Sequence, residues 1–260
     1  MTETGLSPTM DLRERVIIVT GAAQGIGAAI ATALAARGAT IAIGDLQPAD
    51  QIVEKISTAG GRASSGHCDV TSAESVAQFV NDTATRHGTI TGLVNNAALF
   101  SAIKPTRFED FDGSIYRAAY DVNVVGTIGM ITAVTPIMRN NGYGKIVNIG
   151  SSSVLKGSTM LLPYVVSKGA VHAIARALAR ELGPDGIRIN TVTPGLTLSD
   201  GVHNAGNVSA ERITDDMRTR ALAREQTPED VTGAVAFLQS ADSDFMTGQL
   251  VNVDGGSQLH

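Results

Sequence analysis

The segment between residues 15 and 38 limits the possible folds of this chain more than any other stretch. Residues 15–20 (RVIIVT) are mostly apolar and β-branched, which predicts a strand buried on both faces. A glycine-rich turn follows at residues 21–27 (GAAQGIG), and an alanine-rich helical pattern then runs to Gly38. Glycines let a backbone approach a phosphate group closely, and the amino terminus of a helix attracts its charge. The glycines could form a simple tight turn, but their place between strand and helix favours a phosphate-binding unit.

Strand and helix patterns continue to alternate along the rest of the chain. Further strands are expected at Ala39–Gly44, Arg62–Cys68, Ile90–Val94, Lys145–Ile149, Arg188–Thr193 and Gln249–Val253. Helices are expected at Ala49–Thr58, from a capping box at residues 71–74 to His87, and at Phe111–Asn140, Tyr164–Leu182 and Pro228–Ser240. Alternation of this kind predicts one doubly wound α/β domain over residues 1–260, built on a parallel sheet with right-handed crossovers. The irregular segment of about residues 196–224 is long enough to form a substrate lid.

Composition excludes several classes of protein. The chain has 260 residues, a net charge of −5 and no long basic run, so nucleic acid and anionic membranes are not expected partners. The single cysteine, Cys68, excludes an internal disulfide and suits a reducing cytosol. No signal peptide is visible, no run approaches the ~18 apolar residues of a membrane span, and no His, Cys and carboxylate cluster has metal-site spacing. We therefore expect a cytoplasmic enzyme or binding domain without a metal.

Tyr164 and Lys168 are the strongest candidates for chemistry. Positions i and i+4 share one helical face, so the Lys168 ammonium can lie beside the Tyr164 phenol and favour its ionised form. Such a tyrosine could exchange a proton with a substrate hydroxyl near neutral pH. A short motif also arises by chance. Its neighbourhood supports the functional interpretation, because Ser151 ends a predicted strand thirteen residues earlier, where ligands gather in open α/β sheets.

Asp45 indicates which dinucleotide the chain prefers. It ends the second predicted strand about twenty residues after the glycines, where a carboxylate can accept hydrogen bonds from an adenosine ribose. The same carboxylate would repel a 2′-phosphate, and neither Leu46 nor Gln47 supplies a cation to reverse that preference. A surface aspartate at a strand end is the simpler alternative. The position favours NAD over NADP.

Other polar residues at strand ends allow more than one interpretation. Asp69 could contact an adenine amino group or cap its own turn. Asn95 and Asn96 could tie neighbouring loops together, while the alanines after them leave room for a cofactor. Asn123 lies among apolar neighbours inside a predicted helix, where asparagine is unfavourable, and this suggests a local backbone role.

Taken in order, these motifs resemble the short-chain dehydrogenase/reductase family from Arg15 to about Gly256. The resemblance rests on residues 20–27, 69–70, 95–97, 123, 151, 164–168, 194–195, 247–249 and 252–256. It implies a seven-stranded Rossmann-type sheet, hydride transfer with a nicotinamide, and a catalytic set of Asn123, Ser151, Tyr164 and Lys168. In that set Tyr164 is the general acid or base, Ser151 orients the substrate oxygen, Lys168 tunes Tyr164 and holds the nicotinamide ribose, and Asn123 anchors a water relay.

The resemblance also implies partners and cofactor contacts. The expected NAD contacts are Gly21, Gln24, Gly25, Ile26, Gly27, Asp45, Asp69, Val70, Asn95, Ala97, Tyr164, Lys168, Pro194, Gly195, Thr197 and Ser199. A homotetramer is expected, and the two long helices, apolar around much of their circumference, agree with burial against a partner. Three departures from the family pattern are Gly150 for a second serine, Ala98 for a glycine and Ser199 for a threonine.

The substrate is expected to be a small alcohol or ketone. Leu155, Leu161, Leu162, Leu196 and Phe100 could line an apolar pocket for a neutral or aromatic secondary alcohol, or could simply anchor loops. The first half of the predicted lid has no cluster of Arg or Lys for a polyanion. Two other functions remain open: an NADPH-dependent reductase of β-ketoacyl type, and a non-catalytic dinucleotide sensor.

Overall fold

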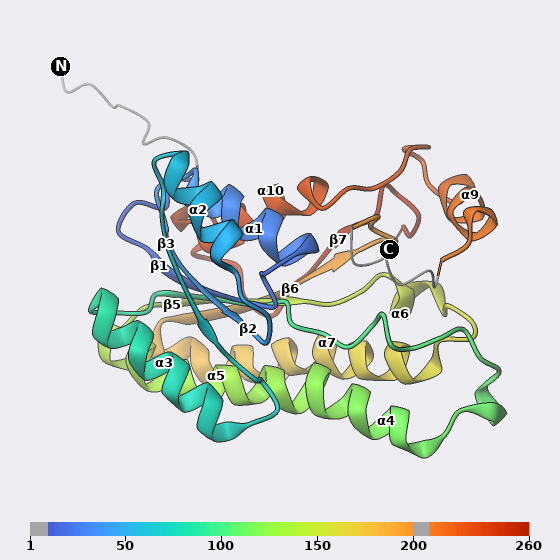
Figure 1. Cartoon of the computed structure of the whole chain (residues 1–260), viewed down its shortest axis with the longest axis horizontal. Helices are drawn as coiled ribbons and strands as arrows, with labels where there is room; N and C mark the ends of the chain where they lie inside the picture. Colours follow the sequence, from blue (N-terminus) through green and yellow to red (C-terminus); the bar gives the residue numbers. More distant parts are fainter. Residues whose placement is uncertain (1–9, 200–207, 260) are drawn as a thin grey trace.

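A computed structural model describes residues 10–199 and 208–259, and its centre is a seven-stranded sheet (Figure 1). The strands lie in the order β3-β2-β1-β4-β5-β6-β7, and all pairs are parallel. Their bounds are β1 Val16–Thr20, β2 Thr40–Asp45, β3 Arg62–His67, β4 Gly92–Asn95, β5 Gly144–Ile149, β6 Ile187–Pro194 and β7 Leu250–Val253. The predicted α/β class, the doubly wound parallel sheet and the number of strands are confirmed. Strand order reverses between β1 and β4, so the carboxyl ends of these strands border the crevice where such folds bind ligands.

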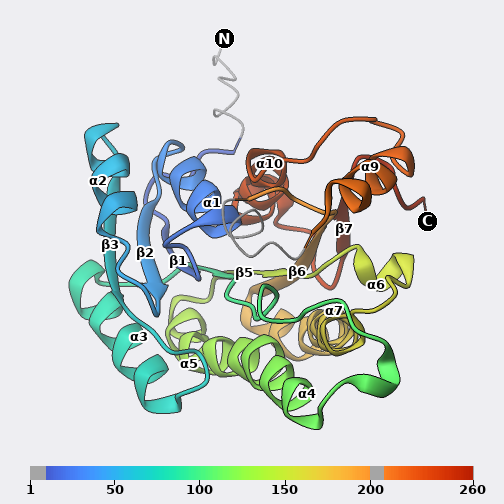
Figure 2. The same cartoon turned by 45° about the vertical axis from the view of Figure 1, so that its right-hand side comes forward.

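Helices cover both faces of the sheet (Figures 1 and 2). One layer contains α1 Gly25–Ala35, α2 Asp50–Thr58 and α10 Glu229–Gln239; the other contains α3 Ala73–His87, α4 Gly113–Tyr120, α5 Gly126–Asn141 and α7 Leu162–Leu182. Two short helices, α6 Ser153–Lys156 and α9 Ala210–Arg218, lie near the carboxyl ends of the strands. Single 3₁₀ turns occur at Phe108–Asp110, Gly183–Asp185 and Ala241–Ser243.

Strand β1 explains why two cores form. All five of its residues are buried, and successive side chains point to opposite faces. Ile17 and Val19 pack with α1, α2 and α10 in one core, whereas Ile18 packs with α3, α5 and α7 in the other. Strand β3, at the sheet edge, is polar and largely accessible, which accounts for its weak sequence signal.

The helix predicted over residues 111–140 is interrupted in the structure. A single π-helical turn, Asp121–Val125, joins α4 to α5 and places Asn123 at its centre. The predicted capping box at residues 71–74 is also shifted. The cap is Ser72, whose hydroxyl accepts a hydrogen bond from the Ser75 amide at 3.3 Å. The Thr71 hydroxyl instead donates to Asp69, so Glu74 does not complete a box.

The helical run Gly113–Asn141 is more apolar than the sequence analysis allowed. An 18-residue window in it reaches a mean hydropathy of 1.4, so by length and composition alone this run could cross a membrane. No 18 consecutive residues of this run are apolar, because Arg117, Asp121 and Asn123 interrupt it, so the narrower expectation of no such uninterrupted run holds. Half of the window is buried inside the protein, where α5 contributes Met130 and Val134 to the core. A helix that covers one face of a sheet has this pattern of burial.

Candidate active site

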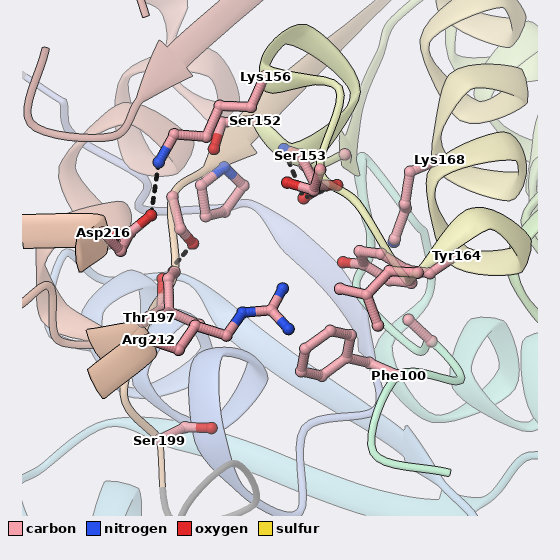
Figure 3. Close-up of a pocket in the computed structure, with 18 of the residues that line it drawn as sticks. Phe100, Ser152, Ser153, Lys156, Tyr164, Lys168, Thr197, Ser199, Arg212 and Asp216 are labelled. Atoms are coloured by element: carbon pink, nitrogen blue, oxygen red, sulfur yellow. Dashed lines mark hydrogen bonds and ion pairs between the residues drawn. The ribbon is translucent and has the colours of Figure 1, made fainter. Parts of the chain in front are cut away.

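A cavity of about 860 Å³ opens at the carboxyl ends of the central strands. Its walls come from the glycine turn, the loop after β5, the first turns of α7, the segment after β6, and α9 (Figure 3). Ten of the predicted site residues line it: Gln24, Gly25, Ile26, Ser151, Tyr164, Lys168, Pro194, Gly195, Thr197 and Ser199. The predicted residues outside its walls are Gly21, Gly27, Asp45, Asp69, Val70, Asn95, Ala97 and Asn123. Of the expected substrate-pocket residues, Phe100, Leu161 and Leu196 line the cavity.

The glycine turn has the geometry that an anion-binding backbone requires. Gly21 has a φ of +63°, and a Cβ added there would lie 2.7 Å from the Ala97 Cα atom. Only glycine can therefore occupy this position. The next helix, α1, begins after Gln24 without a side-chain cap, and its first turn contains no acidic residue. Its amide groups thus remain available to a diphosphate, which fits a dinucleotide at this end of the cavity.

Asp45 lies directly over the glycine turn. Its Oδ2 atom accepts a hydrogen bond from the Ala23 amide at 2.8 Å, and its Oδ1 atom accepts one from the Gln47 amide at 2.9 Å. These two bonds fix the carboxylate at the end of β2. The neighbouring Leu46 side chain is 57% exposed and carries no charge.

Asn95, the last residue of β4, and Asn96, which follows it, have different contacts, although the sequence analysis gave both the same role. Asn96 donates from its side-chain amide to the Thr20 and Gly21 carbonyl oxygens at 3.0 and 2.7 Å, which ties the β4 loop to the glycine turn. Asn95 instead donates to Asn148 on β5 at 2.9 Å and is buried within the sheet. Asn96 and Ala98, rather than Asn95 and Ala97, line the cavity.

Asp69 serves its own turn in this structure. Its Oδ1 atom accepts hydrogen bonds from the Thr71 amide and hydroxyl, and these bonds lower the pKa of the Asp69 carboxyl. The turn-capping alternative is therefore observed, while the adenine contact stays a prediction. The adjacent Val70 packs against α5, where a Cβ on Gly126 would lie 2.8 Å from its Cγ2 atom.

Tyr164 and Lys168 project from α7 toward the cavity (Figure 3). The Lys168 Nζ atom donates to the Ile149 carbonyl at 2.7 Å and lies 5.9 Å from the centre of the Tyr164 ring. Burial raises the pKa of Tyr164 to about 12, and a hydrogen bond with Ser151 opposes that shift. Phe100 packs edge-on against the phenol ring, with 4.9 Å between ring centres.

The expected depression of the Tyr164 pKa by Lys168 is absent from this structure. The ammonium is directed to the end of β5, so desolvation dominates the titration of the phenol. Burial also lowers the pKa of Lys168 to about 8, and the side chain is only 3% exposed. The two groups are close, as predicted, but each is shifted by its own burial rather than by the other's charge.

Ser151 is held by two contacts that the sequence analysis did not identify. Its Oγ atom donates to the Ser153 hydroxyl at 2.8 Å, and its amide lies 3.4 Å from the His172 Nε2 atom. Burial, then the charges of Lys168 and Arg176, lower the pKa of His172 to about 4. His172 follows Lys168 by four residues on α7, and this spacing was the signal that could have revealed it.

The departure at Gly150 has a physical reason. A Cβ at this position would lie 2.6 Å from the His172 Nε2 atom and 2.8 Å from the Thr191 Cγ2 atom. A serine there would collide with both side chains. The imidazole therefore occupies the space that the family's usual residue would need.

Asn123 has the local backbone role that its sequence context suggested. Its Oδ1 atom accepts from the Leu99 amide at 2.7 Å, and its Nδ2 atom donates to the Ser167 hydroxyl at 2.9 Å. The side chain thus joins the loop after β4 to α7, and the π turn places it there. Asn123 is 1% exposed and does not line the cavity, so the expected water relay stays a prediction.

Comparisons with known proteins agree with this arrangement. A family model described as enoyl-(acyl carrier protein) reductase matches residues 21–258. An uncharacterized oxidoreductase of Methylorubrum extorquens is 37% identical over 252 residues, covering 94% of this chain and 98% of that protein. The 7alpha-hydroxysteroid dehydrogenase of Bacteroides fragilis is 32% identical over 248 residues, covering 95% of each. The structure of a short-chain type dehydrogenase/reductase from Mycobacterium ulcerans gives a TM-score of 0.90 at 30% identity, covering 95% of this chain and 90% of that one.

Fold, glycine turn and cavity define an oxidoreductase of the class that binds a nicotinamide dinucleotide across a parallel sheet. The relatives cover nearly the whole chain at 30% identity or more. The chain belongs to the short-chain dehydrogenase/reductase family, as its motifs predicted.

Proposed function

We propose that this protein transfers hydride between NAD and a secondary alcohol or its ketone. The observation that carries the proposal is the meeting of Ser151, Tyr164 and Lys168 on one cavity that also reaches the glycine turn. Family membership supports oxidoreductase activity, and the relative named as a hydroxysteroid dehydrogenase supports an alcohol substrate. A non-catalytic sensor would not need these three groups on one cavity.

The nicotinamide, when bound, supplies or accepts the hydride. Tyr164 then transfers the proton at the substrate oxygen: its phenol donates to a carbonyl during reduction and becomes phenolate, and its phenolate accepts the proton of a hydroxyl during oxidation and becomes phenol. A pKa of about 12 keeps this phenol protonated at neutral pH, the state needed for donation. Ser151 orients the same substrate oxygen by hydrogen bonding and stabilises charge developing on it.

Lys168 and Asn123 support Tyr164 and Ser151 by positioning the elements around them. With a pKa of about 8, Lys168 is mostly protonated at neutral pH and holds the end of β5 through Ile149. By resemblance, the same ammonium binds the nicotinamide ribose. Asn123 positions α7 through Ser167 and, by resemblance, anchors a proton-relaying water.

NAD rather than NADP is proposed because Asp45 is fixed at the end of β2. Two backbone amides hold the carboxylate above the glycine turn, and it retains lone pairs for a ribose diol. A 2′-phosphate at the same place would meet this negative charge beside an uncharged Leu46. An NADPH-dependent reductase of β-ketoacyl type remains the alternative.

The central experiment compares Tyr164→Phe with Tyr143→Phe. Tyr143 lies outside the cavity, and its hydroxyl donates to Asp244 at 3.0 Å. Tyr164→Phe should lower kcat at least ~10²-fold, the low end of general acid–base contributions, and leave the NADH dissociation constant nearly unchanged. Tyr143→Phe should retain kcat.

The assay uses a panel of secondary alcohols and ketones, with an enoyl thioester added because the matching family model is described as an enoyl reductase. Near-normal turnover by Tyr164→Phe would remove Tyr164 from the mechanism. Turnover of the enoyl thioester alone would replace carbonyl chemistry by reduction of a carbon–carbon double bond.

We also propose a homotetramer. Helices α4 and α5 follow one another through the π turn, and this run lies beside α7 on one face of the molecule (Figures 1 and 2). Their outer side exposes Tyr120, Val125, Ile128 and Val166 at 42–54%, a row of apolar side chains that a partner subunit would cover. Val166→Asp should lower the mass measured by light scattering. A monomeric wild type at micromolar concentration would contradict the assembly.

A further inference from the structure

Arg212 occupies a position that the stability of its own helix does not explain. It is the third residue of α9, where the helix dipole favours acids over cations. The side chain is partly buried and lines the cavity. Figure 3 shows its guanidinium extending across the cavity toward Phe100 and Tyr164.

The position of α9 is fixed by Asp216. Its Oδ1 atom accepts from the Lys156 Nζ atom, and its Oδ2 atom accepts from the Arg220 Nη2 atom. Lys156 ends α6, which begins two residues after Ser151. These ion pairs connect the helix carrying Arg212 to the loop carrying Ser151, so the guanidinium is held on the substrate side of the site.

Arg212 and Asp216 are four residues apart and would ordinarily pair on the helix surface. Both oxygen atoms of Asp216 already have cationic partners. Asp215 pairs with Arg218, and Glu211 is adjacent in sequence, so it does not share a helical face with Arg212. Within residues 10–199 and 208–259, the Arg212 guanidinium has no ion pair.

The two other cations on the cavity wall have other roles. Lys156 pairs with Asp216, and Lys168 donates to the Ile149 carbonyl beside Tyr164, at the reacting end of the proposed site. Glu211 and Asp215 also line the cavity, and neither forms an ion pair with Arg212. Among the described lining residues, Arg212 is therefore the cation without an acidic partner on the α9 side of the cavity. A guanidinium fork matches the two oxygens of a carboxylate or the oxygens of a sulfonate.

We propose that the substrate carries a carboxylate or sulfonate that Arg212 binds while the substrate's hydroxyl or carbonyl oxygen lies at Tyr164. Phe100, which packs against Tyr164, lies beside the space between the two ends and supplies apolar contact for the carbon chain that joins them (Figure 3). The inference rests on the proposed alcohol–ketone function and replaces the neutral substrate expected from sequence by an anionic one. The cofactor diphosphate is the other source of an anion in this cavity, and the experiment separates the two.

The experiment uses the full chain with 3-hydroxybutanoate, 4-hydroxypentanoate and 5-hydroxyhexanoate, each compared with its methyl ester. The variant is Arg212→Gln, and the matched control is Arg218→Gln, an exposed arginine on the same helix that pairs with Asp215. For at least one acid, wild type should show kcat/KM at least ~10-fold above that of the ester, the effect of one charge-assisted pair. Arg212→Gln should remove this advantage through a higher KM for the acid. Arg218→Gln should retain it.

A second measurement keeps the inference separate from the proposed function. Calorimetry follows binding of the same acids and esters to the free protein and to the protein with NADH, so Arg212 is tested even if no alcohol is oxidised. Tighter binding of an acid than of its ester, lost in Arg212→Gln, supports the proposal. Equal binding of acids and esters by wild type, or no binding of any acid, overturns it. An Arg212→Gln protein with weakened NADH binding and an intact preference for acids assigns the guanidinium to the cofactor instead.

Discussion

Strand β5 has a tyrosine and a lysine near each of its ends, and the fold surrounds the two pairs differently. At the amino end, Tyr143 and Lys145 both contact Asp244, the lysine Nζ atom at 2.8 Å and the hydroxyl at 3.0 Å. At the carboxyl end, Tyr164 and Lys168 have no carboxylate between them. They face a cavity instead.

Burial alone does not distinguish the two pairs. It raises the pKa of both Tyr143 and Tyr164 to about 12. The lysines differ, because Asp244 opposes the lowering of the Lys145 pKa by burial, whereas burial acts unopposed on Lys168 and lowers its pKa to about 8. A tyrosine with a raised pKa therefore does not by itself indicate an active site. A buried cation that lacks a counter-charge and borders a cavity is the stronger indication of function.

The largest expected effect comes from replacing each lysine in turn. Lys168→Met should lower kcat at least ~10²-fold and weaken NADH binding, because by resemblance this ammonium binds the nicotinamide ribose and positions the nicotinamide for hydride transfer. Lys145→Met should retain kcat but lower the free energy of unfolding by about 1–3 kcal/mol, because it leaves Asp244 without its cation. Steady-state kinetics and urea denaturation of both variants provide the comparison.

Equal loss of activity in the two lysine variants would abolish the distinction between the ends of β5. A Lys145→Met protein as stable as wild type would show that the Asp244 ion pair contributes nothing net. Either result would make the surroundings of the lysines a poor guide to function.

The second prediction tests whether Asp45, at the carboxyl end of β2, selects the cofactor without affecting the alcohol substrate. Asp45→Ser with Leu46→Arg should convert at least a tenfold preference for NAD into a preference for NADP, because it removes a repelling carboxylate and adds a fork for the 2′-phosphate; ~1.4 kcal/mol already gives tenfold. The KM for the alcohol should change little. Asp50→Ser, at the start of α2, is the control and should keep the NAD preference. Preference of the unmodified protein for NADPH in side-by-side kinetics would remove Asp45 from cofactor selection.

The positions of the glycine turn and of Asp45 were easier to predict from the sequence than those of Arg212 and His172. Gly21 and Asp45 are tied to a strand–turn–helix unit that is continuous in the chain, so their places follow from local pattern. Parallel strands bring their carboxyl ends to one edge, which also placed Ser151 near Tyr164. Element bounds agreed to within a few residues, except at the π turn around Asn123, where a long apolar pattern hid a change in helical geometry.

The substrate end depends on contacts between distant segments. Arg212 faces the cavity because Asp216 binds Lys156, which lies 60 residues earlier in the chain, and no local pattern encodes that ion pair. His172 and Gly150 fit each other through packing of α7 on β5, which spacing alone does not specify. Of the predicted lid at about residues 196–224, the part between residues 200 and 207 lies outside the described residues.

A third prediction concerns this packing. Gly150→Ala should destabilise the protein by about 1–3 kcal/mol, because the new Cβ would lie 2.6 Å from His172. Combining it with His172→Ala should reduce that cost in part, since Thr191 still crowds the position. Gly233→Ala in α10 is the control; its Cβ meets no atom within 4 Å, and it should be neutral or stabilising. Thermal unfolding of Gly150→Ala, His172→Ala, the double variant and Gly233→Ala measures the coupling, and additive effects would show that the imidazole does not exclude a side chain at position 150.

The smallest effect is a pH dependence of stability that should differ between the two lysines. Burial lowers the folded-state pKa of Lys168 from 10.5 to about 8, so the unfolded chain binds more protons between these values and stability should rise with pH across that window. Tyr164 acts oppositely only above pH 10, because its folded-state pKa is raised from 10.0 to about 12. Urea denaturation between pH 7 and pH 10 should therefore show the free energy of unfolding of wild type increasing relative to that of Lys168→Met. The increase should reach up to ~1.4 kcal/mol per pH unit inside the window. Lys145→Met should show a weaker dependence, since Asp244 opposes the shift there. A difference between wild type and Lys168→Met that stays constant with pH would mean that burial does not shift the pKa of Lys168, and the contrast between the two ends of β5 would then be wrong for the lysine at the carboxyl end.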